Sequence, residues 1–150
     1  MKLEMMTTAD DVTMLSKLKV VDFLYDHLDE YGDKKEYIKK ALDYALSPYP
    51  SAGGFIIYYE EKGEIIGAVV INNTGMQGYI LENILVYIAV HKDYRGKGIG
   101  KKLMNKTIEL TKGDIALHVE EDNPARFLYE KVGFENPYLE MRYYKEKAKA

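Results

Sequence analysis

The amino-acid sequence predicts an α/β fold in which one mixed sheet carries helices on both faces. An apolar, β-branched run at 84–90 is typical of a buried strand, and apolar residues at steps of three and four over 10–31 are typical of an amphipathic helix. The elements follow the order β-α-α-β-β-β-α-β-α-β, which indicates a mixed α/β protein. The 150 residues contain no Pro- or Ser-rich linker and no internal repeat, so we expect a single domain over 1–150.

The first half of the chain is expected to hold two helices and three strands. The apolar positions of the first helix are Met14, Leu18, Val21, Tyr25 and Leu28. Asp33 and Glu36 have the spacing of a capping box, which predicts the start of the second helix. Turn-forming residues at 47–54 end that helix. The expected elements are a strand at 2–6, helices at 10–31 and 33–45, and hairpin strands at 55–60 and 64–71.

The second half is expected to alternate strands and helices. A polar loop at 72–78 leads into a long strand, and a glycine-containing loop then opens a helix. Pro124 stands at the first position of a short helix, where proline is well tolerated, and Gly133 ends that helix. The expected elements are a strand at 79–90, a helix at 99–110, a strand at 115–119, a helix from 124 through 129, a closing strand at 138–144 and a solvated tail at 145–150.

Composition and charge narrow the function classes. The chain is 47% hydrophobic and 30% charged with a net charge of −3, which is ordinary for a soluble globular protein. A mildly acidic chain argues against nucleic-acid binding, because duplex binding needs a basic face. The absence of cysteine excludes disulfides and a thiol nucleophile, and three scattered histidines do not indicate a metal site. Without a signal pattern or a membrane-spanning apolar run, we expect a cytoplasmic protein that does not contact a membrane.

The segment 90–103 is a basic, glycine-containing loop that joins a strand to a helix. Backbone N–H groups at the start of a helix have no partner within the helix, and the helix dipole makes them attractive to phosphate. Glycines allow the backbone to approach an anion closely, and Arg95, Lys97 and Lys101 add positive charge. The loop therefore predicts a phosphate site.

Two common phosphate loops do not fit the spacing. A P-loop has four residues between its first glycine and the Gly-Lys pair, whereas three residues separate Gly96 from Gly100 and Lys101. Lys102 also stands at the position of the required Ser or Thr. A dinucleotide fingerprint is G-x-G-x-x-G early in the fold, whereas residues 96–100 read G-x-G-x-G late in the chain. We therefore exclude both loops.

The spacing of Arg95, Gly98 and Gly100 behind a strand resembles the acetyl-CoA loop of the GNAT acetyltransferase family, whose signature is Gln/Arg-x-x-Gly-x-Gly/Ala. The order of elements is similar as well, which implies a GNAT-like, mostly antiparallel sheet. The resemblance implies that amides of the loop hold the CoA pyrophosphate and that the end of the preceding strand offers backbone groups to the pantetheine arm. The implied cofactor residues are Ile88, Ala89, Val90, Arg95, Gly96, Lys97, Gly98, Ile99, Gly100 and Lys101.

The segment 127–134 is similar to the family's Leu/Phe-Tyr-Glu-Lys-x-Gly-Phe segment. This similarity implies that Tyr129 protonates the leaving thiolate of CoA, since a phenol with an ordinary pKa of about 10 holds its proton at neutral pH. The family commonly has an Asn that contacts CoA seven residues before this tyrosine. Asp122 occupies that position and Asn123 lies six residues before Tyr129, so either residue is open for the contact, and we choose Asn123. Both residues would also serve as helix caps.

Two residues are candidates for the general base that takes the proton of the amine. Glu82 lies thirteen residues before Arg95, a spacing at which some family members place a catalytic glutamate, and apolar neighbours would raise its pKa. His118 lies on the expected strand at 115–119, where other members carry Glu, and its ordinary pKa of about 6.5 suits the role. A water molecule is the third option.

These residues predict an acetyl-CoA-dependent N-acetyltransferase that moves acetyl to a primary amine of a small molecule or a peptide. Family members usually react by direct attack within a ternary complex, and the absence of cysteine agrees with that route. The acceptor is expected between the two N-terminal helices and the sheet. The alternatives are a non-catalytic acyl-CoA-binding module of the same fold and a nucleotide or phosphate binder, and a homodimer stays open.

Overall fold

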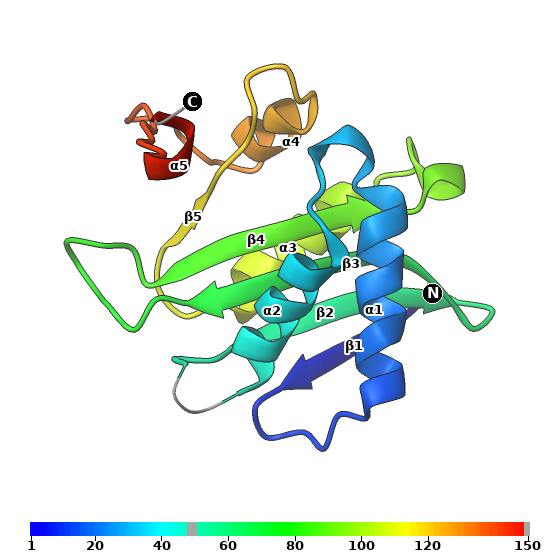
Figure 1. The fold of residues 1–150 in the computed structure, drawn as a ribbon. Helices are drawn as coiled ribbons and strands as arrows, with labels where there is room; N and C mark the ends of the chain where they lie inside the picture. The colour runs from blue at the N-terminus through cyan, green and yellow to red at the C-terminus, as the bar shows by residue number, and fades with distance from the viewer. Residues whose placement is uncertain (48–50, 149–150) are drawn as a thin grey trace.

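The computed structural model describes residues 1–47 and 51–148, so residues 48–50 of the predicted turn and 149–150 of the predicted tail lie outside the described residues. Five strands within that part form one sheet in the order β1-β2-β3-β4-β5 (Figure 1). Strands β1 to β4 pair with one another in antiparallel fashion, and β5 runs parallel to β4. The strands are β1 (Lys2–Thr7), β2 (Gly54–Glu61), β3 (Glu64–Asn73), β4 (Asn83–Val90) and β5 (Ile115–Leu117). The predicted α/β class with a mostly antiparallel sheet is confirmed.

Helices cover both faces of the sheet (Figure 1). One core joins α1 and α2 to one face through side chains such as Leu24, Leu42 and Val70. A second core joins α3 and α4 to the other face through Leu103, Tyr129 and their neighbours. The α-helices are α1 (Met14–His27), α2 (Lys35–Leu46), α3 (Ile99–Leu110), α4 (Ala125–Lys131) and α5 (Lys145–Ala148), and the short 3-10 turns are η1 (Asp29–Tyr31) and η2 (Lys92–Tyr94).

The buried face of α1 differs from the predicted one. Of the predicted positions, Met14 is 60% exposed and Tyr25 is 49% exposed. The core takes Val20 and Leu24, which are fully buried, beside the predicted Val21 and Leu28, so the prediction of the apolar face was only partly correct. Apolar residues occur around most of this helix, and packing on the sheet selects one stripe that periodicity alone did not distinguish. The helix begins at Met14 because the Thr13 hydroxyl accepts a hydrogen bond from the Ser16 amide at 3.1 Å.

Strand β4 contains a bulge and then a free edge. Its register against β3 passes from Leu85 to Tyr87, so Val86 is an extra residue without a partner on β3. The bulge changes the face of the side chains that follow: Leu85 packs under α3, whereas Tyr87 packs under α1 and α2. On the other side, β5 pairs only with residues 83–85. Among the described residues, β4 therefore has no strand partner on this side from 86 to 90.

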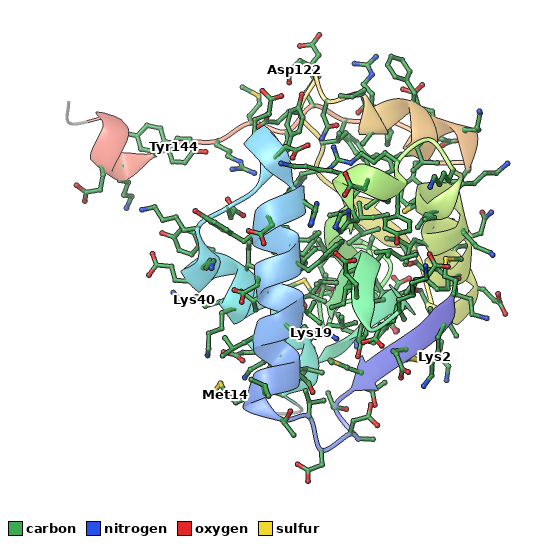
Figure 2. All side chains as sticks on the ribbon, turned by 90° about the vertical axis from the view of Figure 1, so that its right-hand side faces the viewer. Lys2, Met14, Lys19, Lys40, Asp122 and Tyr144 are labelled. Carbon is green, nitrogen blue, oxygen red and sulfur yellow. The ribbon has the colours of Figure 1, made fainter. Side chains whose placement is uncertain are left out.

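The predicted closing strand is wrong. Residues 135–144 have no strand or helix, and Tyr138, Leu139 and Met141 are each at least 85% exposed. A β-rich run becomes a strand only where a neighbouring backbone is within hydrogen-bonding reach. Here Arg142 instead donates a local hydrogen bond to Glu140, two residues away, at 2.5 Å. Figure 2 shows Tyr144 beside α5, at a distance from the sheet. The expected tail is helical at Lys145–Ala148.

The strands around the site are also shorter than predicted. β4 starts at Asn83 and not at 79, and β5 ends at Leu117 and not at 119. No helix in the described part of the chain is long and apolar enough to cross a membrane. In the same residues, no group of three His, Cys, Asp or Glu side chains is placed to hold a metal ion.

Candidate active site

A cavity of about 340 Å³ opens where β4 enters the basic loop. Its walls come from the end of α1 and η1, the free edge of β4, the start of α3 and the start of α4. The predicted cofactor residues Lys97 and Lys101 do not line it. The predicted site residues that do are Ile88, Ala89, Val90, Arg95, Gly96, Gly98, Ile99, Gly100, Asn123 and Tyr129. The cavity thus brings together segments that lie up to 102 positions apart in the sequence, from His27 to Tyr129.

The loop presents backbone amides at the start of α3. Gly96 and Gly98 have φ angles of 76° and 81°, in the left-handed region that other residues avoid. Gly98 caps α3, and the first amide bonded within the helix is that of Lys102, which donates to the Gly98 carbonyl at 3.1 Å. The amides of residues 99–101 therefore lie in the unpaired first turn, at the positive end of the helix dipole. This arrangement suits a phosphate group.

Gly100 has a different role from the two glycines before it. A Cβ added there would lie 3.2 Å from Leu128 and 3.7 Å from Val90. Its missing side chain therefore lets α3 approach α4 and the end of β4 closely. Gly100, Leu128 and Val90 all line the cavity.

The free edge of β4 leads directly into this loop. Residues 86–90 lack a β5 partner, and the strand continues into η2 and the start of α3. Ile88, Ala89 and Val90 line the cavity, so an extended amide chain has backbone groups to bind along this edge. The carbonyl of Val90 already accepts a hydrogen bond from Arg95 Nε at 3.0 Å. Ile88 and Ala89 are therefore the better placed residues for the pantetheine arm.

Arg95 does not point its charge at the phosphate site. Its Nη1 binds the Asp29 carboxylate at 2.8 Å, and its Nη2 donates to the carbonyl of His27 at 2.8 Å. The guanidinium also holds the pKa of Asp29 below its usual range. Lys97 lies over the Tyr94 ring at 5.1 Å. The side chains of Arg95 and Lys97 are thus engaged with other groups of the protein, whereas the glycines at 96, 98 and 100 line the cavity.

Tyr129 is the titratable side chain of α4 in the cavity wall. It is 7% exposed and packs against Phe134 with ring centres 6.1 Å apart. Burial raises the pKa of Tyr129 to about 12, because the charged phenolate would lose its water shell. The phenol therefore remains protonated at neutral pH, as a general acid requires.

Asn123 and not Asp122 lines the cavity. The Asn123 side chain accepts a hydrogen bond from the amide of Ala125 at 2.9 Å, and so it also caps the start of α4. The backbone carbonyl of Asp122 accepts a hydrogen bond from the Tyr31 hydroxyl at 3.2 Å. In Figure 2, Asp122 lies at the end of the molecule where α1 terminates.

The structure separates Glu82 from this cavity. Glu82 stands just before β4, at the end opposite the basic loop, and lines another cavity of about 520 Å³. Its carboxylate accepts hydrogen bonds from the amides of Asp114 at 2.8 Å and Gly78 at 3.1 Å. These bonds lower the pKa of Glu82, so the expectation of a raised pKa was wrong. The Glu82 side chain thus joins the segments at Gly78 and Asp114, and it lines a different cavity from Tyr129.

His118 follows the last paired residue of β5 and is exposed. It does not line the 340 Å³ cavity. Ile115 and Leu117 pack on the α3 side of the sheet, so alternation places His118 on the α1 and α2 side. Tyr87 packs on that same side, one residue past the bulge. His118 thus stands where β4 and β5 separate, on the side predicted for the acceptor.

The structure also shows a polar pair on the α1 and α2 side of the sheet that the sequence did not predict. The Tyr87 hydroxyl donates to the Asp33 carboxylate at 2.6 Å. Asp33 was interpreted as a helix cap, and Tyr87 looked like one more residue of a buried strand. Only the bulge turns Tyr87 toward α2, and the sequence carries no clear signal for a bulge.

The chain resembles known acetyltransferases in sequence and structure. Residues 18–134 match the acetyltransferase (GNAT) family. N-alpha-acetyltransferase 30 of Schizosaccharomyces pombe is 30% identical over 113 residues, which are 72% of this chain and 73% of that protein. The ribosomal protein bS18 alanine N-acetyltransferase of Haemophilus influenzae is 38% identical over 88 residues, which are 56% of this chain and 57% of that protein. A ribosomal-protein-alanine N-acetyltransferase from Brucella melitensis biovar Abortus has the same fold, with a TM-score of 0.63 at 17% identity over 95% of this chain and 98% of that chain.

The matched region contains the whole cavity, from the end of α1 to Tyr129. It confirms the family predicted from Arg95, Gly98 and Gly100. It also confirms the predicted class of enzyme, because relatives in this family are N-acetyltransferases and the family uses acetyl-CoA as cosubstrate. The chain belongs to the GNAT family of acetyltransferases.

Proposed function

We propose that the protein transfers the acetyl group of acetyl-CoA to the N-terminal amine of a peptide or protein. The observation that carries this proposal is a single cavity in which the free edge of β4, the first-turn amides of α3 and the buried Tyr129 phenol meet. These three features match the three parts of the cosubstrate: an amide-containing arm, a pyrophosphate and a thiol that must leave.

The proposed residue roles follow the chemistry of direct attack. The amine nitrogen forms a bond to the acetyl carbon, the carbon–sulfur bond breaks, the nitrogen loses a proton and the sulfur gains one. The amides of residues 99–101 would bind the pyrophosphate, and Ile88 and Ala89 would align the arm along β4. Tyr129 would supply the proton to sulfur, since its raised pKa keeps the phenol protonated.

We propose His118 as the residue that takes the proton from the amine, directly or through water. It stands at the point where β4 and β5 separate, on the side of α1 and α2. We do not propose Glu82 for this role, because it lies at the other end of β4 and lines another cavity. His118→Ala should lower both kcat and kcat/KM by about 10²-fold or more. Glu82→Gln should leave both unchanged, and the opposite result would restore Glu82.

The acceptor proposal rests on the relatives and on local charge. The relatives from Schizosaccharomyces pombe and Haemophilus influenzae are named for N-alpha and ribosomal-protein-alanine acetylation. Burial, followed by the charges of Asp122, Glu30 and Glu120, raises the pKa of Tyr31, so acidic groups lie near Tyr31 in the cavity wall. Such acidic groups attract the ammonium group of a peptide N-terminus.

A panel of acceptors tests this proposal. The protein should acetylate peptides with a free N-terminus and leave N-formylated copies of the same peptides unmodified, with mass spectrometry to locate the acetyl group. Turnover of aminoglycosides or polyamines, with none of peptides, would overturn the peptide assignment. Acetyl-CoA binding without turnover of any amine would favour the non-catalytic module. A cytoplasmic location and a homodimer stay predictions from the sequence.

A further inference from the structure

We propose that Arg95 is a positioning residue for the acceptor and does not hold the CoA pyrophosphate. Its guanidinium ties residues 28–31, called the strap below, to the loop that opens α3. The inference deepens the proposed function, because it assigns a signature position to the acceptor side of the reaction. It depends on contacts at both ends of the strap.

The first contact is the guanidinium itself. Its three nitrogens bind the Val90 carbonyl at 3.0 Å, the Asp29 carboxylate at 2.8 Å and the His27 carbonyl at 2.8 Å. A planar guanidinium whose three nitrogens all form hydrogen bonds is held in one orientation. Asp29 also neutralises its charge, and Lys92 approaches the same carboxylate at 3.6 Å. These bonds use three of the five N–H donors of the guanidinium, so only one N–H on each Nη is left for a phosphate.

The second observation is the backbone of Asp29. Its φ angle of 55° lies in the left-handed region, which is uncommon for a residue other than glycine. Such a conformation persists where surrounding contacts over-determine it. Here those contacts are the ion pairs with Arg95 and Lys92. The turn that starts the strap is therefore held in shape from the cofactor loop.

The third observation is the other end of the strap. The Tyr31 hydroxyl binds the Asp122 carbonyl at 3.2 Å, next to Asn123 in the opposite wall. Leu28, Asp29 and Tyr31 all line the cavity. The strap thus crosses from the wall that holds the α3 loop to the wall that holds α4. Asp33, two residues after the strap, accepts a 2.6 Å hydrogen bond from the Tyr87 hydroxyl. The position of the strap therefore also affects the α1 and α2 side of the sheet, where the acceptor is expected to bind.

Two roles for Arg95 give different results in matched variants. A positioning role requires Asp29 as much as Arg95, whereas a phosphate-binding role does not involve Asp29. Arg95→Gln and Asp29→Asn should each lower acceptor kcat/KM about tenfold or more, as expected for loss of a charged hydrogen bond. The double variant should be no worse than either single one, because both remove the same contact. The Kd of acetyl-CoA should stay within about threefold of wild type in all three.

Arg95→Lys separates charge from geometry. Lysine keeps the positive charge but lacks the planar fork, so it should behave like Arg95→Gln in acceptor kinetics. Lys112→Gln, in the cavity at the end of β4 away from the basic loop, serves as the control for loss of one surface cation. If Arg95→Gln weakens acetyl-CoA binding about tenfold or more while Asp29→Asn matches wild type, Arg95 binds the pyrophosphate and the proposal is overturned.

A measurement without acceptor keeps this test independent of the proposed function. Hydrogen exchange of the amides at 28–31, with acetyl-CoA bound, should speed up in Arg95→Gln and Asp29→Asn but not in Lys112→Gln. Exchange in the core strands should stay unchanged, which distinguishes a local release from general destabilisation. If no peptide is acetylated by wild type, the acceptor assignment fails, and the exchange result still decides the role of Arg95. Unchanged exchange at the strap in both variants would overturn it.

Discussion

The hydroxyl of Tyr87 donates a 2.6 Å hydrogen bond to the carboxylate of Asp33, and this bond joins the centre of β4 to the segment that leads into α2. Tyr87 is 8% exposed, and both burial and the adjacent carboxylate raise its pKa, so the phenol acts as a donor at any physiological pH. The bulge at Val86 makes the bond possible, because without it Tyr87 would face α3.

Tyr87→Phe removes this hydrogen bond and leaves the ring in place. We expect the free energy of unfolding to fall by about 1 kcal/mol, because Asp33 is exposed and water replaces part of the bond. Acceptor kcat/KM should fall about tenfold, because the start of α2 is no longer fixed to the sheet. Tyr59→Phe is the matched control, since Tyr59 is also 8% exposed but packs on the other face. Equal losses in both variants would contradict a specific role for the Asp33 contact.

Two glycines allow a direct test of the cofactor loop: Gly98 lies in the loop, and Gly63 lies in the turn between β2 and β3. Gly98 and Gly63 have φ angles of 81° and 77°, and an added Cβ meets no atom within 4 Å at either position. Asp at either position should cost about 1 kcal/mol of stability through the strained backbone. Only Gly98→Asp places a carboxylate beside the first-turn amides of α3, so only this variant should lose acetyl-CoA binding.

Thermal unfolding with ligand measures the difference. At 100 times its Kd, acetyl-CoA should stabilise wild type and Gly63→Asp by about 2.7 kcal/mol, which raises Tm by several degrees. ATP and NAD at the same concentration should leave Tm unchanged. A normal acetyl-CoA shift in Gly98→Asp would refute the assignment of the pyrophosphate to this loop.

Local signals account for the parts of the site that the sequence predicted. The β-branched run before Val90 and the glycines at 96, 98 and 100 are each determined by backbone conformation, which a few neighbouring residues decide. The same is true of Tyr129 within its short helix. These residues meet in one cavity because a strand, a loop and two helices are linked in the predicted order.

Contacts between distant segments account for the features of the site and the fold that the sequence did not predict. Glu82 looked like a base because its neighbours are apolar, but amides of Gly78 and Asp114 satisfy its carboxylate. Arg95 was predicted to lie at the pyrophosphate, and the sequence did not show that its guanidinium binds Asp29, 66 residues earlier. The run at 138–144 has β-rich composition, but it pairs with no strand of the sheet that the described residues form. No pattern within a short window contains these partners.

Tyr129→Phe tests the proposed acid. The variant keeps the ring that packs against Phe134 and loses only the hydroxyl, so acetyl-CoA binding and Tm should be unchanged. We expect kcat to fall by about 10²-fold or more. Tyr129 should also contribute no ionisation to the kcat profile of wild type below about pH 10, because its pKa is raised to about 12. Tyr138→Phe, at an 85% exposed tyrosine, is the control. Near-normal kcat in Tyr129→Phe would assign the proton to water.

His27 should make stability depend on pH at the end of α1. Its Nδ1 accepts a hydrogen bond from the Lys92 amide at 3.1 Å, and its ring lies 4.2 Å from that of His91. Burial, followed by the charge of nearby His91, lowers the pKa of His27. The unfolded chain, with an ordinary pKa near 6.5, therefore binds this proton more readily than the folded protein does.

The stability linked to His27 is thus fully present above pH 6.5 and is lost as the pH falls through the lowered pKa of the folded state. Protonation removes the acceptor for Lys92 and places a positive charge near Arg95, so the contact between α1 and the cofactor loop should loosen first. His27→Asn keeps an acceptor oxygen and cannot be protonated. Its Tm should decline less than that of wild type between about pH 7 and pH 5. His118→Asn, at an exposed histidine, should retain the wild-type decline, and the reverse pattern would assign the pH dependence to His118.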